Sequence, residues 1–272
     1  MTMLVLDFDG TMTDAEAEGG PYRLGYLQDL ALLVDRPADE VLALAERLEG
    51  QVLANPEQHG WLFGGSIVAP ASVDPYLRVM PVARMLLDHF GVLEVPHERE
   101  RVLDRILYKY NYKKTLNVFR EGAGAFLRGL EGQAVYVVTN SHTDAVQEKL
   151  ADLGADWLVP RVHGLAKKYV LEPGFSEVPE SMSLPGLGRP VLLRRGHYHR
   201  VLSQLLADEG KAWSELLVVG DIFELDLCLP LQLGARVGLM VNEFTPAYEV
   251  DFLRGHARGY VLGGIPEIAG LL

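Results

Sequence analysis

The amino-acid sequence predicts an α/β protein with a doubly wound, mostly parallel sheet and an inserted α-helical domain. Short apolar runs alternate with amphipathic stretches along most of the 272 residues, the order expected of a parallel sheet covered by helices. Three of these runs end in polar signatures, DFDGT, VTNS and VVGD. The carboxyl ends of the strands line the active crevice of such sheets, so the three signatures are expected to meet there.

Six apolar runs rich in valine and leucine are interpreted as strands, because continuous apolar runs of this length suit strands buried on both faces. They cover residues 3–8, 134–139, 156–160, 215–220, 236–240 and 259–262.

Helical patterns lie between these runs, and a segment rich in proline, glycine and serine at 172–190 is expected to be an exposed loop. The helices are expected near residues 122–131, 143–153, 197–209, 224–233 and 246–254.

The interval between the first two strands is too long for a simple crossover, which needs only about a dozen residues. Residues 15–118 have helical texture, with one apolar stripe at Val41, Leu42, Leu44, Ala45 and Leu48. We therefore expect a core domain of residues 1–14 and 119–272, interrupted by a helical cap domain at 15–118. Within the cap, residues 60–72 are expected to form a long loop.

The composition argues against several classes of partner. The net charge of −12 disfavours binding to nucleic acid or to an anionic membrane, and no apolar run reaches the roughly 20 residues that span a bilayer. A lone cysteine, Cys228, allows no intramolecular disulfide, and the N-terminus lacks the pattern of a signal peptide. These features favour the cytosol and a small anionic ligand.

Two carboxylates follow the first strand closely. Asp7 ends the strand and Asp9 comes two residues later, while Gly10 permits the sharp turn between them and the next segment. One carboxylate can attack a phosphate ester while a second moves the proton, and a divalent cation would relieve their repulsion. An ordinary Asp-Gly turn after a strand is the alternative interpretation of this segment, and the segment favours the chemical one.

The segment DFDGTMTD resembles the first motif of the haloacid dehalogenase-like (HAD) superfamily, and the later strand ends are similar to its other motifs in the same order. The resemblance implies a HAD-like Rossmann-type core with an inserted helical cap. It places Thr139, in VYVVTNS, at the phosphate-binding position, with Gly10 nearby. It also makes Asp221 a metal ligand and Asp226 the second acidic residue, in VVGDIFELD. Asn140 either orients the nucleophile or the phosphate, or caps the helix that begins near Thr143.

The third motif of the family is a lysine or arginine that bridges the nucleophile and the phosphate. The resemblance favours Arg195, or Arg194 beside it, just before the helix that leads to the last acidic motif. Lys167 and Lys168 are the competing candidates further upstream.

The resemblance implies a Mg²⁺-dependent phosphatase that hydrolyses a small phosphorylated metabolite through an aspartyl-phosphate. Asp7 would be the nucleophile and Asp9 the acid and base, with the metal held by Asp7, the main chain of Asp9 and the two later aspartates. A phosphomutase or phosphotransferase on the same fold, or a non-catalytic binding or regulatory protein, are the alternatives. Asp9 and the later acidic pair argue against a 2-haloacid dehalogenase.

Overall fold

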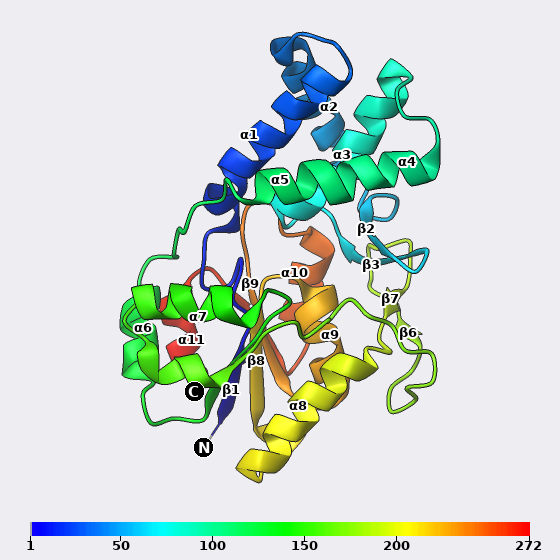
Figure 1. Cartoon of the computed structure of the whole chain (residues 1–272). Coiled ribbons are helices and arrows are strands. Elements are labelled where there is room, and N and C mark those ends of the chain that lie inside the picture. Colours follow the sequence, from blue (N-terminus) through cyan, green and yellow to red (C-terminus); the bar gives the residue numbers. More distant parts are fainter. Residues whose placement is uncertain (1) are drawn as a thin grey trace. The chain divides into compact units, whose positions relative to one another are not determined.

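The computed structural model describes residues 2–272, and the chain forms two compact units. The first unit consists of the chain up to Asp14, the segment Leu62–Ala69 and the segment Phe119–Leu272. The second consists of Ala15–Trp61 and Pro70–Val118. Figure 1 shows the elements of both units in the colours of the sequence.

The first unit is built on a six-stranded sheet whose neighbouring strands, over the described residues, pair in parallel. β1 lies in its middle, with β4 on one side and β8 on the other, so the carboxyl ends of these three strands are neighbours. Across the sheet the order is β10 (Gly259–Leu262), β9 (Arg236–Met240), β8 (Leu216–Gly220), β1 (Met3–Leu6), β4 (Val135–Val138) and β5 (Val162–His163).

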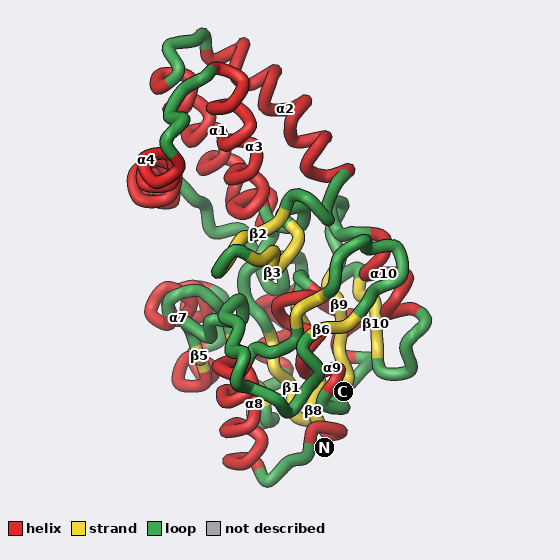
Figure 2. Tube along the Cα trace, turned by 90° about the vertical axis from the view of Figure 1, so that its right-hand side faces the viewer, coloured by secondary structure: helices red, strands yellow, loops and turns green. Residues whose placement is uncertain are grey.

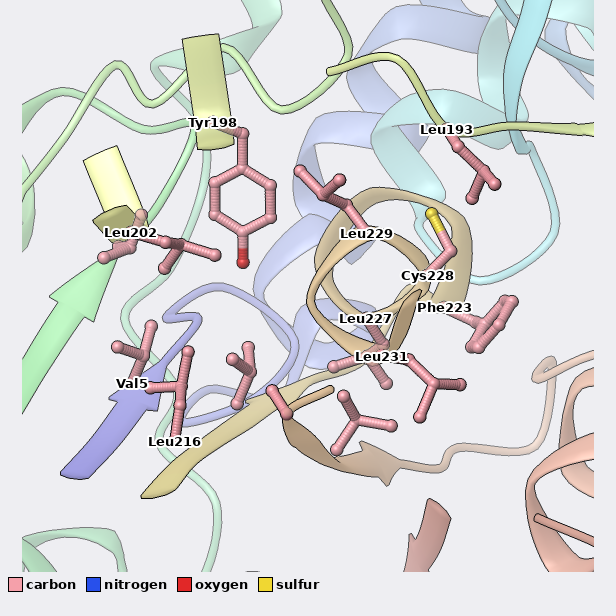
Figure 3. Packing of buried hydrophobic residues seen from close by; sticks show 14 of the residues in the cluster. Val5, Leu193, Tyr198, Leu202, Leu216, Phe223, Leu227, Cys228, Leu229 and Leu231 are labelled. Atoms are coloured by element: carbon pink, nitrogen blue, oxygen red, sulfur yellow. The ribbon is translucent and has the colours of Figure 1, made fainter. Parts of the chain in front are cut away.

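Both faces of this sheet are buried, as the apolar runs predict. In β1, Met3 and Val5 belong to one core and Leu4 and Leu6 to the other, because successive side chains of a strand point to opposite faces. Figure 3 shows the first of these cores around Tyr198, from α8. The helices that contribute to it are α8 (Gly196–Glu209), α9 (Cys228–Gln232) and α10 (Ala247–Arg254). The opposite face receives α6 (Ala123–Gly129), α7 (Thr143–Asp152) and α11 (Ile265–Ala269). The predicted doubly wound α/β class is confirmed.

One predicted strand is wrong. Residues 156–160 belong to a 3₁₀ helix, η2 (Asp156–Arg161), and the sixth strand is the short β5 that follows it. Pro160 ends the run and has no N–H to donate to a strand ladder, and the short β5 begins only two residues later, at the edge of the sheet. The fourth predicted helix begins as a π-helical turn, η4 (Phe223–Leu227), and continues as α9.

Two stretches expected to be loops contribute residues to short strand pairs. β2 (Gly60–Phe63) and β3 (Ser66–Pro70) form a hairpin, which corrects the interpretation of residues 60–72 as a plain loop. Its turn is Gly64-Gly65, with φ of 58° and 82°, and two positive φ values match the twist of a hairpin. The second pair is β6 (Ser181–Met182) and β7 (Val191–Leu192), which are antiparallel.

The second unit is helical, and Figure 2 shows three of its helices packed together. They are α1 (Ala15–Leu33), α2 (Ala38–Ala54) and α3 (Pro75–Phe90), followed by α4 (Pro96–Glu100), η1 (Arg101–Tyr108) and α5 (Lys109–Tyr112). The side chain of Asp74 accepts a hydrogen bond from the Tyr76 N–H and so caps α3, which ends at Gly91 in the left-handed conformation. Within residues 2–272, none of the helices has the length and apolar character to cross a membrane.

Candidate active site at the ends of three parallel strands

The turn after β1 brings its carboxylates to the edge of the sheet. The N–H of Asp7 still pairs with the carbonyl of Val219, at 2.8 Å, so Asp7 continues the strand. The chain then turns at Gly10, whose φ is 75° and whose N–H donates to Thr13 Oγ1 at 3.1 Å. A Cβ at this position would lie 2.0 Å from Asp221 Oδ2, so both the turn and the neighbouring acid require glycine.

Three buried carboxylates converge beneath this turn. Asp7, Asp221 and Asp226 each offer an oxygen, and the three oxygens lie within 4.8 Å of one another. Asp226 is fixed by the Ile222 N–H, which donates to its Oδ2 at 3.1 Å. A Cβ on Gly220 would lie 2.4 Å from the Cβ of Asp226, so a second glycine makes room for this group.

A lysine lies among these acids. The Lys168 ammonium is 2.6 Å from Asp7 Oδ1 and 2.7 Å from Asp226 Oδ1, and its side chain is only 1% exposed. Burial acts against the ammonium, but the charges of Asp226 and Asp7 outweigh it and raise the pKa of Lys168, which is therefore charged. Burial raises the pKa of Asp7 to about 7, although Lys168 acts in the opposite direction.

The charges of the cluster do not balance. Three carboxylates lie beside the Lys168 ammonium and within the charge of the Arg120 guanidinium, which acts on Asp221, and burial makes the remaining negative charge unfavourable. Carboxylate oxygens are the preferred ligands of hard divalent cations such as Mg²⁺. The residues present therefore fit a divalent cation, which Asp7, Asp221 and Asp226 can hold.

The position of Lys168 corrects the preference for an arginine. The Arg195 guanidinium is buried but donates to main-chain carbonyls, of Lys168 at 2.5 Å and Val68 at 2.8 Å. Arg194 Nη1 donates to the Pro173 carbonyl at 3.1 Å. Lys168 reaches Asp7 instead because the chain after β5 turns sharply, with a φ of 46° at Lys167, its exposed neighbour.

Thr139 and Asn140 occupy the adjacent end of β4. Thr139 is 2% exposed, and its Oγ1 accepts the N–H of Ser141 at 3.1 Å. Asn140 Oδ1 accepts the N–H of Lys168 at 2.8 Å. This bond makes Asn140 a support for the lysine. Together with Arg195 on the carbonyl of Lys168, it holds the main chain of that residue on both sides.

The side chain of Asp9 lies apart from the group formed by the other three acids. It is 37% exposed, and each of its oxygens has its own donor. Ser141 Oγ donates to Oδ2 at 2.6 Å, and Lys149 Nζ donates to Oδ1 at 3.2 Å. Neither partner stood out in the sequence, because a serine in a loop and a lysine in the last turn of a helix are common surface residues.

Arg120 is another site residue that the sequence did not reveal. Its Nε and Nη2 donate to the Gly10 carbonyl at 3.0 and 2.8 Å, so its guanidinium fixes the turn, and its charge also acts on Asp221. Its neighbour Phe119 forms a bridge with Thr13. Residues 119 and 120 thus stabilise the turn that follows β1.

Solved structures with a similar fold extend over the whole chain. A predicted phosphoglycolate phosphatase from Haemophilus somnus is 16% identical, with a TM-score of 0.58, over 100% of this chain and 97% of that one. A HAD-superfamily hydrolase of subfamily IA, variant 1, from Geobacter sulfurreducens is 18% identical, with a TM-score of 0.52, over 100% and 96%. A putative HAD hydrolase from Bacillus subtilis, bound to magnesium, is 15% identical, with a TM-score of 0.54, over 100% and 98%.

No protein-family model matches the sequence, and no curated protein matches it. The similarity to solved structures nevertheless defines the fold: a six-stranded parallel sheet with a helical insertion, as in HAD hydrolases of subfamily IA. The resemblance seen in the motifs is thereby confirmed for the fold, since the structural neighbours are HAD-superfamily hydrolases and phosphatases.

Proposed function

We propose that the protein is a Mg²⁺-dependent phosphatase of the HAD superfamily that acts on a small phosphorylated metabolite. The observation that carries this proposal is the Lys168 ammonium between Asp7 and Asp226, in a buried cluster with a further carboxylate. A nucleophilic carboxylate must approach a phosphate that is itself negative, so it needs a cation beside it, and the cluster supplies the Lys168 ammonium together with carboxylates that can hold a divalent ion. A merely structural ion pair would not require a third acid.

In the first step, one oxygen of the Asp7 carboxylate attacks phosphorus in line with the leaving group. The new Asp7 O–P bond forms as the P–O bond to the alcohol breaks. The carboxyl proton of Asp9 passes to the leaving oxygen, giving the free alcohol, an aspartyl-phosphate at Asp7 and a carboxylate at Asp9. Lys168 and the hydroxyl of Thr139 are assigned to the phosphoryl oxygens, with the turn at Gly10 beside them.

In the second step, a water molecule attacks the phosphorus of the aspartyl-phosphate. Its proton passes to the Asp9 carboxylate, and the bond between phosphorus and Asp7 breaks. Inorganic phosphate leaves, and both aspartates return to their starting states. Asp9 thus serves as acid in one step and as base in the other, as a single well-placed carboxyl group can.

Asp7, Asp221 and Asp226 would hold the Mg²⁺ ion, and the resemblance adds the main chain of Asp9. When bound, the ion supplies positive charge that screens the nucleophile from the phosphate and stabilises the charge of the transferring group. Its presence also favours the ionised form of Asp7, whose pKa burial otherwise raises to about 7.

The test is turnover of p-nitrophenyl phosphate and of a broad set of phosphorylated metabolites, with and without Mg²⁺. We expect Mg²⁺-dependent release of phosphate, trapping of phosphate on Asp7 after rapid quenching, and loss of both in Asp7→Asn. No turnover on any ester would refute the phosphatase, and turnover that survives Asp7→Asn would refute the covalent mechanism.

A further inference from the structure

We infer that Ser141 and Lys149 are positioning residues for the acid–base carboxyl group of Asp9, and this inference rests on the proposed function. Asp9 is the one proposed catalytic acid outside the three-carboxylate cluster, so neither Lys168 nor the metal ligands hold its side chain. A proton donor must meet the leaving oxygen at a defined distance and angle. Its orientation therefore has to come from other residues.

The two contacts fix the carboxyl group at both oxygens. Ser141 comes from the loop after β4 and Lys149 from the last turn of α7, so the donors belong to different elements. Ser141 Oγ reaches Oδ2 at 2.6 Å and Lys149 Nζ reaches Oδ1 at 3.2 Å. Two donors on opposite oxygens restrain rotation of the carboxylate plane, which a single donor would leave free.

Both donors are themselves restrained. The N–H of Ser141 is bound to Thr139 Oγ1, and its carbonyl accepts the Leu165 N–H at 2.8 Å. The Lys149 side chain is 18% exposed, and its ammonium lies 5.8 Å from the centre of the Phe8 ring. Because Phe8 lies between the two catalytic aspartates in sequence, Lys149 contacts the catalytic turn twice.

The chemistry of the two donors differs in a useful way. An ammonium can only donate, so the Asp9 oxygen that faces Lys149 remains an acceptor throughout the reaction. A hydroxyl can donate or accept, so Ser141 can follow either state of the other oxygen. The geometry thereby assigns the transferred proton to Oδ2.

Leaving-group dependence tests this role. A nitrophenolate leaves without protonation, whereas a simple alkoxide needs the proton from Asp9. We expect Ser141→Ala and Lys149→Met to lower kcat/KM by about tenfold to a hundredfold on an alkyl phosphate, but by less than about threefold on p-nitrophenyl phosphate. The ratio kcat/KM is chosen because it reports the steps up to and including transfer of the phosphoryl group to the enzyme. The later hydrolysis of the aspartyl-phosphate no longer involves the leaving group.

Three further readouts separate positioning from a general structural effect. Lys149→Arg and Ser141→Thr should restore most of the loss on the alkyl phosphate. The Mg²⁺ concentration for half-maximal activity should not change, because Asp9's side chain lies outside the three-carboxylate cluster. Lys211→Met and Ser203→Ala are the matched controls: Lys211 pairs with Glu215 and Ser203 with His199, and we place neither in the site.

Each result decides the matter. Equal losses on the two esters, or no loss on either, would overturn the inference while leaving the phosphatase intact. A wild-type protein inactive on both esters would overturn the proposed function, and the inference with it. Asp9→Asn provides the reference, since it should show the largest difference between the two esters. The two single substitutions remove different contacts, so a folding defect in one leaves the other as a test.

Discussion

Each unit buries one long basic side chain among carboxylates, and the two clusters differ in their charge balance. In the second unit, Arg78 is 2% exposed and pairs with Glu16 and Glu49 at 2.6 Å. Arg23 also pairs with Glu49. Two guanidinium groups and two carboxylates therefore balance one another, as expected of a cluster that joins α1, α2 and α3.

The cluster around Lys168 in the first unit lacks such a balance. The Lys168 ammonium faces Asp7 and Asp226, and Asp221 beside them feels the charge of Arg120, so three carboxylates meet two cations. Burial of unbalanced charge destabilises a fold, so such a cluster persists only where another cation compensates for it or where function requires it. Both clusters contain a buried ion pair, so burial does not distinguish them. The net charge of the cluster distinguishes the candidate active site from the structural cluster.

The largest expected effect comes from removing the cation of the unbalanced cluster. Lys168→Met should lower kcat on phosphate esters by about a thousandfold, because the nucleophile and the phosphate lose their shared positive charge. Lys167→Met is the matched control, since that lysine is exposed and adjacent in sequence. Steady-state kinetics on p-nitrophenyl phosphate measures both variants, and comparable losses in the two would contradict the assignment.

The balanced cluster should respond in stability instead. Arg78→Met leaves Glu16 and Glu49 without their buried partner and should lower the free energy of unfolding by about 3–5 kcal/mol. Denaturant unfolding measures this loss. Arg84→Met is the control, because its partner Glu100 is 42% exposed and the pair should contribute only about 0–1 kcal/mol. A loss for Arg78→Met no larger than the control's would show that the balance of this cluster has no structural role.

Magnesium should stabilise the unbalanced cluster. At a hundredfold excess of Mg²⁺ over its Kd, ligation adds about 2.7 kcal/mol, so the melting temperature should rise by several degrees. Asp226→Asn should reduce this shift, because it removes one of the three carboxylates. Glu49→Gln, in the other cluster, should leave the shift unchanged. Calorimetry decides between the two outcomes, and a shift that survives Asp226→Asn would place the metal elsewhere.

The smallest effect concerns the pH dependence of the metal-free protein. Burial raises the pKa of Asp7 from 3.8 to about 7, so the folded state prefers the protonated form. Its contribution to stability is therefore constant below about pH 4, falls as the pH rises from 4 to 7, and levels off above that. In EDTA, Asp7→Asn should raise the free energy of unfolding by about 1–2 kcal/mol at pH 8, and by less at pH 5. Urea unfolding at the two pH values checks this, and the reverse order would exclude Asp7 as the source.

Sequence reasoning recovered the sheet because the signal is local. The run from Met3 to Leu6 is apolar at every position, and burial on both faces demands this. The error at residues 156–160 was harder to see, because proline is tolerated in an edge strand, and the strand at this place lies at the edge of the sheet. The hairpin was missed because Gly64-Gly65 resembles a flexible linker unless the flanking residues are recognised as strands.

The acids of the site were predictable for the same reason. Asp7 and Asp221 directly follow strands, so their position depends only on the strand ends. Lys168 depends on an irregular segment in which Leu165 and Lys167 take positive φ values, and such turns are not fixed by residue type. Arg195 fitted the spacing of the motif, but its guanidinium donates to the main-chain carbonyls of Lys168 and Val68.

The hairpin formed by β2 and β3 affects how the inserted helical unit can be exchanged between related proteins. The chain passes between the two units four times, at residues 14/15, 61/62, 69/70 and 118/119. Residues Leu62–Ala69 belong to the first unit, where Arg195 binds the carbonyl of Val68. A transplant of residues 15–118 as one cassette would therefore carry away a piece of the recipient's own scaffold. Chimeras should be spliced at all four crossings, so that each host keeps residues 62–69, which form most of the hairpin, and exchanges the rest of the insertion.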